Sequence, residues 1–181
     1  STYLNMEQDG VDGKLRCSFN STGTVTGRIS SSESVFGGGA NLQNVPKKLR
    51  DIIIPRSEMM FTEADLIGAE AMVVAYLCDD PVLIHKFEKG ENVHTYTAQM
   101  IWGISEDEVK ANKAKCDAEG RDTESYYFIG KKVRHSGNYL ASWKSLSESV
   151  KCSAAEAKVL LSKFYSFNPN LRKWHEEVFR E

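Results

Sequence analysis

Residues 61–77 read FTEADLIGAEAMVVAYL and combine two patterns. The first residues continue an apolar run from Met59 that is typical of a short buried strand, whereas residues 69–77 are rich in good helix formers. Asp65 lies at the junction, where its carboxylate is expected to project from the end of a strand. Such a position suits a hard divalent cation, which often keeps water and substrate phosphates as its other ligands. Glu70 lies in the apolar helix start, where an unpaired buried glutamate is costly.

The composition predicts a globular protein of one domain or of pieces of two, with 41% hydrophobic and 27% charged residues over 181 positions. No apolar run reaches membrane-spanning length and no signal peptide is present, so we expect a cytoplasmic protein without a membrane partner. The four cysteines are widely spaced, which indicates reduced thiols rather than a zinc site. A net charge of −2 argues against bulk coating of nucleic acid but allows a local basic track. The chain lacks an initiator Met and ends in charged helical sequence, so we expect a partial segment.

Strand patterns are confined to the first third of the chain. Residues 14–20 alternate, and residues 22–28 are expected to pair with them after a tight turn. Residues 52–54, three isoleucines before a proline, predict a short buried strand. Residues 30–40 are loop by composition; their three successive glycines allow close approach of other backbone, although a flexible linker is the favoured interpretation.

The remainder of the chain predicts helices, with start and stop signals at most boundaries. Asn92 is expected to cap a helix over residues 93–102, and residues 105–108 form a capping box that opens a polar helix to residue 118. Ser153 is expected to cap a further helix. The other predicted helices cover residues 69–77, 82–89, 123–140 and 171–179.

The helix predicted over residues 123–140 carries a basic second half. At 100° per residue, Lys131, His135 and Asn138 fall on one face, with Tyr139 beside them. A cationic face that ends in an aromatic side chain could hold a phosphate chain and stack a base. Periodicity alone favours the simpler interpretation, a basic helix surface in contact with solvent.

Three ordered stretches resemble the family A DNA polymerases, the group of bacterial DNA polymerase I and many phage replicases. Residues 26–32 and 41–46 match T-G-R-L-S-S … N-L-Q-N-I-P, with a longer Gly-rich insert. Residues 65–72 match motif A, D-Y-S-Q-I-E-L-R, and the similarity continues into residues 90–95. Motif B, K-x-x-x-F-G-x-x-Y-G, places Lys131 at the lysine, His135 at the aromatic residue and Tyr139 at the tyrosine.

The resemblance implies roles around an incoming nucleotide. Asp65 would bind two Mg²⁺ ions together with a second carboxylate from motif C, and the carbonyl of Leu66 would complete the shell. Glu70 would be the gate that occupies the space of a 2′-hydroxyl. His94 and Lys131 would hold the triphosphate, with Lys131 as proton donor to pyrophosphate. His135 and Tyr139 would also belong to the nucleotide-binding site.

The resemblance also implies contacts with primer–template DNA. Tyr139 would stack near the templating base, and Arg28 would reach the minor groove. Asn41, Gln43 and Asn44 would contact the DNA backbone.

The implied fold class is α+β, part of a right-hand polymerase with a palm antiparallel sheet segment and mostly helical fingers. Residues 1–95 would be partial palm and residues 96–181 fingers with the motif B helix; motif C and the thumb are absent. The implied activity of the parent enzyme, a DNA-directed DNA polymerase of phage or viral origin, is addition of deoxynucleoside triphosphates to a primer 3′ end by two-metal phosphoryl transfer. We expect a monomer, in the host cytoplasm if the source is a phage, and no useful activity from the 181-residue segment alone.

Five positions depart from the family pattern: Ile67, Gly68, Phe128, His135 and Leu140. Phe128 stands where the family has an arginine, and Lys132 or Arg134 could substitute for that phosphate contact. Because of these departures, one alternative is a degenerate polymerase that only binds DNA. The other alternative is a single-subunit RNA polymerase, against which Glu70 argues. The polymerase interpretation requires Asp65 and Lys131 to share one cleft.

Overall fold

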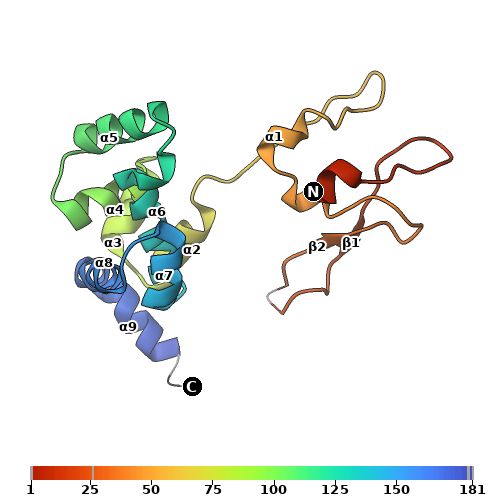
Figure 1. Cartoon of the computed structure of the whole chain (residues 1–181). Coiled ribbons are helices and arrows are strands. Elements are labelled where there is room, and N and C mark those ends of the chain that lie inside the picture. Colours follow the sequence, from red (N-terminus) through yellow and green to blue (C-terminus); the bar gives the residue numbers. More distant parts are fainter. Residues whose placement is uncertain (1, 26, 179, 181) are drawn as a thin grey trace. The chain divides into compact units, whose positions relative to one another are not determined.

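Residues 2–25, 27–178 and 180 are described by the computed structural model, in which the chain divides into two units, Ser1–Ala64 and Asp65–Glu181. The first unit contains two short strands, and the second consists of helices and their connections (Figure 1), so the α+β class is confirmed with helices dominating. Thr26 of the Thr-Gly-Arg motif and Phe179 of the last predicted helix lie outside the described residues. Within the described ranges, no helix has the length and apolar character needed to cross a membrane.

The sheet of the first unit consists of β1 (Ser18–Asn20) and β2 (Ser30–Ser32), which pair antiparallel with Phe19 opposite Ser31. The segment predicted to pair with β1, residues 22–28, instead forms part of the connection to β2. The side chain of Asn20 accepts a hydrogen bond from the Thr22 amide (2.9 Å), and the Thr24 hydroxyl donates to the Arg28 carbonyl (2.7 Å), so these contacts favour a loop. The helical elements of this unit are η1 (Thr2–Asn5), η2 (Leu42–Asn44) and α1 (Lys47–Arg50).

The apolar segments 52–54 and 59–61 were predicted as buried strands, and this prediction is wrong. Neither is a strand, and Ile54 and Met60 are 80% and 84% exposed. A strand needs a neighbour to accept and donate its backbone hydrogen bonds. Among the described residues the sheet contains β1 and β2 alone, so these segments have no strand to pair with.

The glycine run that follows β2 is packed, so the flexible-linker interpretation is wrong. The Ser34 amide donates to the Gly38 carbonyl (3.0 Å), and the Gly39 amide donates to the Glu7 carbonyl (2.9 Å). A Cβ atom added at Gly39 would lie 1.9 Å from the carbonyl oxygen of Arg16. Glycine is therefore required at this position by the approach of another backbone segment.

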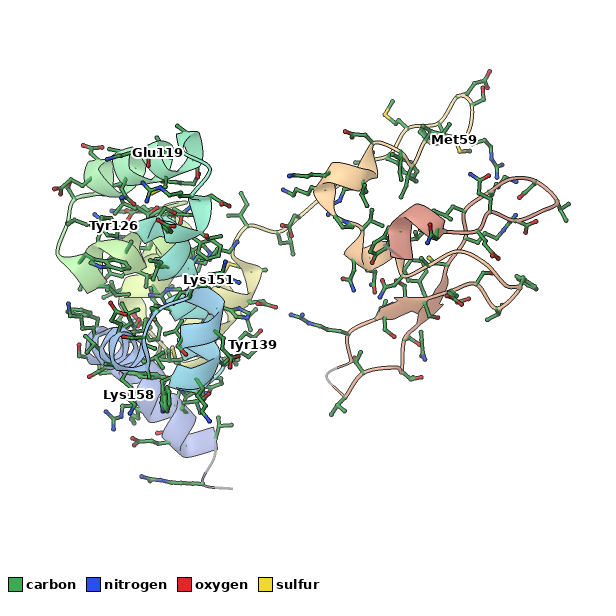
Figure 2. The ribbon with its side chains drawn as sticks, in the orientation of Figure 1. Met59, Glu119, Tyr126, Tyr139, Lys151 and Lys158 are labelled. Carbon is green, nitrogen blue, oxygen red and sulfur yellow. The ribbon has the colours of Figure 1, made fainter. Side chains whose placement is uncertain are left out.

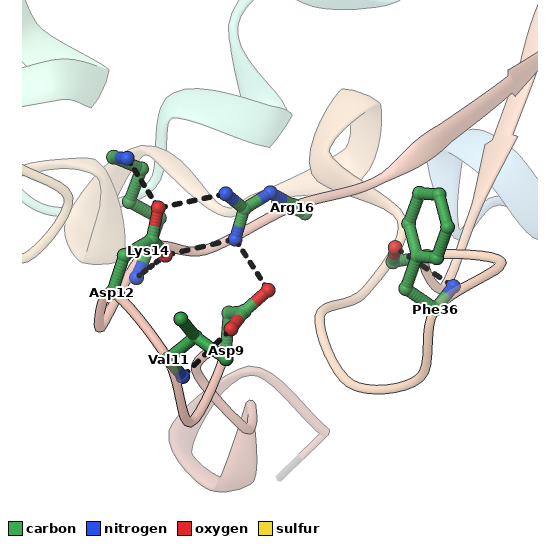
Figure 3. Close-up of polar contacts among 7 residues, drawn as sticks. Asp9, Val11, Asp12, Lys14, Arg16 and Phe36 are labelled. Atoms are coloured by element: carbon green, nitrogen blue, oxygen red, sulfur yellow. Dashed lines mark hydrogen bonds and ion pairs between the residues drawn. The ribbon is translucent and has the colours of Figure 1, made fainter.

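Ion pairs of Arg16 and Lys14 with two aspartates hold the turn over residues 9–14 (Figure 3). The guanidinium lies 2.6 Å from Asp9 Oδ2 and 2.8 Å from Asp12 Oδ2, and Lys14 also pairs with Asp12. The hydrogen bonds from Arg16 hold the pKa of the Asp12 carboxyl well below its usual range. Because these side chains are exposed to solvent, their contribution to stability is small, and the close backbone packing matters more.

Replacing Gly39 with alanine is expected to destabilise the first unit by about 3 kcal/mol, because the new methyl group collides with backbone that has no room to move. Gly37→Ala is the matched control: Gly37 also has positive φ, but nothing lies within 4 Å of its added Cβ. We expect this control to cost about 1 kcal/mol from backbone strain alone. Hydrogen exchange of the β1 and β2 amides measures both effects, and equal losses in the two variants would contradict the packing argument.

The second unit is built from helices arranged around α6. Its elements are α2 (Ala69–Leu77), α3 (Pro81–Glu88), α4 (Val93–Trp102), α5 (Glu106–Ala118), η3 (Asp122–Glu124), α6 (Tyr126–Asn138), α7 (Trp143–Val150), α8 (Ala154–Phe167) and α9 (Pro169–Val178). Helix α6 contacts α2, α4, α5, α7 and α8. Its position in the unit therefore determines which of its side chains face outward.

Helix starts follow the predicted caps. Asn92 accepts hydrogen bonds from the amides of α4, and Ser105 and Ser153 each form a capping box, at the heads of α5 and α8. The helix predicted over residues 123–140 is shorter, because Ser125 caps α6 and a 3₁₀ turn precedes it. Helix α7 was missed, since its serine-rich sequence has few apolar positions. Residues 143, 146 and 150 nevertheless recur at helical spacing.

Two apolar clusters stabilise this unit by removing side chains from water. The larger one includes Val133 of α6 and Phe164 of α8, with buried members Cys78, Ile101, Val133, Leu146, Ala157, Phe164 and Leu171. The smaller one joins α2, α3 and α4 through Ala71, Ala75, Leu83 and Val93. Helix α6 is thus buried on one side and leaves the other side available to carry the predicted site residues.

Candidate functional site

The outward face of α6 carries Lys131 and His135, and Tyr139 follows at its end. Tyr139, labelled in Figure 2, is 54% exposed. Asn138 was predicted to share this face but is buried, because α6 turns that position toward α9. The exposed face is therefore formed by residues at i, i+4 and i+8, with the cationic group first and the aromatic ring last.

Glu70 of α2 meets this face. Its Oε2 atom lies 3.6 Å from His135 Nδ1, and the rings of His135 and Tyr139 have centroids 5.0 Å apart at 57°. Glu70 is in the first turn of α2, where the helix dipole favours a negative charge. Three residues assigned to nucleotide binding by resemblance, separated by up to 69 positions along the chain, are thus brought together by the contact of α2 with α6.

His94 of α4 lies beside the same helix. A Cβ atom added at Gly130 would be 3.1 Å from the His94 carbonyl oxygen, so the two helices are in close contact at this point. Burial, together with the charges of Lys131, Arg134 and His135, lowers the pKa of His94 to about 4. The imidazole is therefore neutral at pH 7. Its Nδ1 atom is buried and has no hydrogen-bond partner within the described part of the chain.

The lowered pKa of His94 predicts loss of stability in acid. Unfolding restores the pKa to about 6.5, so between about pH 6.5 and about pH 4 the unfolded chain binds more protons, and stability falls as the pH falls. Because His94 is partly exposed, we expect the loss of unfolding free energy to be about 2 kcal/mol. Urea unfolding followed by tryptophan fluorescence measures it in the second unit, which contains all three tryptophans. His94→Gln should reduce the dependence of the unfolding free energy on pH. An unchanged dependence in that variant would show that other groups cause it.

Asp65 and Leu66 precede α2 and are exposed. The described residues contain no group of three or more His, Cys, Asp or Glu side chains that could hold a metal. One carboxylate and one carbonyl are nevertheless a donor set that suits Mg²⁺ when water and substrate phosphates supply the other ligands. Asp65 and Lys131 belong to the same unit.

Gly68 accounts for one departure from the motif A pattern. It precedes α2 with φ of 67°, and its carbonyl accepts the hydrogen bond from the Met72 amide (2.9 Å). A side chain is strained in this left-handed conformation, so the glutamine of the family pattern would be unfavourable here. The glycine fits the turn that joins Asp65 to the helix bearing Glu70.

Four of the predicted DNA-contacting residues, Arg28, Asn41, Gln43 and Asn44, lie in the first unit, whereas Tyr139 lies in the second. Asn41 and Gln43 have structural partners. The Asn41 carboxamide oxygen accepts from the Ser31 hydroxyl (2.6 Å) and the Gln43 amide (3.1 Å), which caps η2. The Gln43 side chain donates to the Ile29 carbonyl (3.0 Å). Arg28 and Asn44 are exposed. Asn41 and Gln43 thus hold the Asn-Leu-Gln-Asn segment against β2, leaving exposed polar groups on its surface.

Arg134 is buried, although the sequence pattern predicted it in an exposed basic segment. It was a possible substitute for the missing phosphate contact, but it is only 2% exposed and has the largest side chain among the fully buried residues. The signal was present in the sequence, because Gly130 and Gly137 flank it at the spacing of one helix face. Both glycines are buried against neighbouring helices, so this face was the core face.

The end of α6 is connected to α9. The His175 Nε2 atom lies 3.0 Å from the Asn138 carbonyl oxygen and donates to it, because a carbonyl only accepts. A pocket of about 190 Å³ lies beside Tyr139, lined by Asn138, Tyr139, Leu140, Trp174, His175 and Val178. The contact with α9 thus fixes the backbone immediately before Tyr139.

Comparisons with known proteins identify the family. The sequence matches DNA polymerase family A over residues 1–181. It is 28% identical to DNA polymerase I of Aquifex aeolicus over 94% of this chain and 27% of the relative, and 30% identical to DNA polymerase I of Streptococcus pneumoniae (strain ATCC BAA-334 / TIGR4) over 100% of this chain and 20% of the relative.

A solved structure is also similar. The POL domain of Pol1 from M. smegmatis, in complex with DNA primer-template and dNTP, aligns with a TM-score of 0.73 and 26% identity over 97% of this chain and 29% of that chain. The chain therefore spans less than a third of the relatives it matches. Since the family match extends over residues 1–181 and the fold is similar to that of the solved POL domain, the chain belongs to DNA polymerase family A.

Proposed function

We propose that this chain supplies the nucleotide-binding fingers and part of the palm of an enzyme that adds deoxynucleotides to a primer 3′ end on a DNA template. The observation that carries the proposal is the meeting of α2, α4 and α6, which places Glu70 against His135 and His94 beside α6. The similar mycobacterial structure contains primer-template DNA and a dNTP, which supports the same partners here. In this proposal residues 1–95 are palm and residues 96–181 are fingers.

The residues of α6 and α4 would act on the triphosphate. The Lys131 ammonium is exposed and would pair with phosphate oxygens, and its proton would neutralise the leaving pyrophosphate. Neutral His94 would contribute a hydrogen bond without adding charge. Closure of α6 over the nucleotide would carry Lys131 inward and exclude water.

The sugar and the template would contact the other end of the face. The Glu70 carboxylate, held near His135, would occupy the space of a 2′-hydroxyl and so select deoxyribonucleotides. The Tyr139 ring would stack near the templating base, while Arg28, Asn41, Gln43 and Asn44 would contact primer–template DNA. We place the enzyme in the cytoplasm as a monomer.

Asp65 and the Leu66 carbonyl would hold Mg²⁺ with ligands from motif C of the longer protein. Two such ions, when bound, neutralise charge on the attacking and leaving oxygens of the phosphoryl transfer. By holding these ions, Asp65 would position the 3′ end of the primer relative to the incoming nucleotide.

Primer extension by the longer protein that contains this chain tests the proposal. Asp65→Ala should abolish template-directed extension, whereas Asp107→Ala, which removes an exposed carboxylate of α5, should leave it unchanged. Extension by Asp65→Ala at the unsubstituted rate would reject the catalytic assignment. Preference for ribonucleotides would indicate an RNA polymerase instead. The 181-residue chain alone should not extend a primer above a control without protein, because its sequence has no His-Asp-Glu triplet after Tyr139 to supply the second metal-binding carboxylate.

A further inference from the structure

Arg134 is a buried cation in the interior of the second unit. Burial lowers the pKa of Arg134 to about 10, and the nearby Asp80 charge opposes this shift. Because the pKa stays above 7, the guanidinium is charged at pH 7. A buried charge is costly unless it is paired and hydrogen-bonded. The Arg134 Nε atom donates to Thr97 Oγ1 (2.6 Å) and an Nη atom donates to Asn168 Oδ1 (3.5 Å), while the guanidinium lies 5.1 Å from the Phe164 ring centroid.

Both acceptors of Arg134 are themselves held in place. The Thr97 hydroxyl donates to the Val93 carbonyl (2.7 Å), so its lone pairs are free to accept from the guanidinium. The Asn168 amide nitrogen donates to the Phe164 carbonyl (2.6 Å), which directs its oxygen toward Arg134. One side chain of α6 therefore connects α4 to the junction of α8 and α9 through directional bonds.

The same two helices carry the proposed triphosphate contacts. Thr97 lies three residues after His94 on α4, and Arg134 lies three residues after Lys131 on α6. An apolar side chain of similar volume would fill the same space, but it would allow α6 to slide and rotate on α4. A charged side chain with directional hydrogen bonds holds the two helices in one relative position. Any shift of α6 along α4 would move Lys131 relative to His94.

We propose that Arg134 is a positioning residue of the nucleotide site, which acts through Lys131 by fixing α6 on α4. The proposal rests on the function proposed above. It assigns a role to a residue that does not reach solvent and does not touch the nucleotide.

Equilibrium titration of the longer protein that contains this chain with dATP and Mg²⁺, followed by calorimetry, tests the proposal. Arg134→Met should weaken binding by about fivefold to tenfold. Val109→Ala is the matched control: it destabilises the same unit through a 1%-exposed residue of α5 but leaves the Arg134 network intact, so its dissociation constant should equal that of the unsubstituted protein. A stability effect alone would lower the folded fraction in both variants without changing the affinity of the folded fraction.

A double substitution separates positioning from general damage. If Arg134 acts through Lys131, then Arg134→Met should add little to the weakening already caused by Lys131→Ala. Full additivity of the two effects, or unchanged affinity in Arg134→Met, would overturn the inference. If Arg134→Met does not fold, Thr97→Val, which removes the acceptor for Arg134 Nε, carries the test with the same expected direction. Absence of dATP binding by the unsubstituted protein, or unchanged binding in Lys131→Ala, would instead overturn the proposed function.

Discussion

Lys131→Ala is expected to reduce the primer-extension rate of the longer polymerase about 100-fold to 10,000-fold, the range typical of losing a general acid. The ammonium group stands on the open face of α6, with His135 one turn further along. In the proposed function, its loss would remove both a charge-assisted contact with the triphosphate and a proton source for pyrophosphate. Single-turnover measurements with saturating nucleotide isolate the chemical step, and steady-state measurements give the accompanying rise in KM.

Lys132→Ala is the control for Lys131→Ala. Lys132 carries the same charge on the adjacent position, but its Nζ atom lies over the Phe128 ring, 5.5 Å from the centroid. Removal of Lys132 should change the rate less than threefold, since a surface charge near the site contributes mainly to encounter. Equal losses in the two variants would show that α6 supplies only a diffuse positive potential, and the specific role of Lys131 would then be rejected.

Gly137→Ala is expected to destabilise the second unit by about 3 kcal/mol. A Cβ atom at this position would lie 2.1 Å from Phe164 Cε1 and 2.5 Å from Cδ1, and the ring is 1% exposed with no space into which to move. The Tyr165 hydroxyl also donates to the Gly137 carbonyl (3.1 Å), which holds α8 against α6 at this point. Alanine favours helix over glycine by about 1 kcal/mol, so an observed loss would be a minimum for the steric effect.

Urea unfolding monitored by tryptophan fluorescence measures the effect of Gly137→Ala, because all three tryptophans lie in the second unit. A second substitution, Phe164→Leu, should restore part of the lost stability in the Gly137→Ala background, although the same change alone is destabilising. An unfolding midpoint unchanged by Gly137→Ala would mean that α6 and α8 are not in the contact described here.

Helices could be predicted from the sequence because their signals are local. The Ser105 and Ser153 capping boxes and the Asn92 cap each involve residues three positions apart, and the structure places helix starts at all three. Strands were predicted poorly for the opposite reason. Residues 52–54 and 59–61 have strand composition, but a strand forms only with a partner elsewhere in the chain, and no local pattern reports that partner.

The same distinction applies to the candidate site. Helical spacing by itself places Lys131 and His135 on one face, and the motif order indicates the polymerase family. The contact of Glu70 with His135 depends on how α2 packs against α6, because no sequence spacing relates residues on different helices. Arg134 shows two sequence signals in conflict: a basic residue in a basic run predicts exposure, whereas Gly130 and Gly137 on the same helix face indicate close packing.

The sequence alone determined the helix caps, the cationic face of α6 and the family to which the chain belongs, because each is encoded in residues within one or two helical turns or in an ordered set of motifs. Only the tertiary structure decided that Gly39 and Gly137 are required by close packing, that Arg134 is a buried connection between helices, and that Glu70 and His135 meet. These features depend on segments distant in the chain sharing the same space, and packing density and burial are properties of the folded whole rather than of any stretch of sequence.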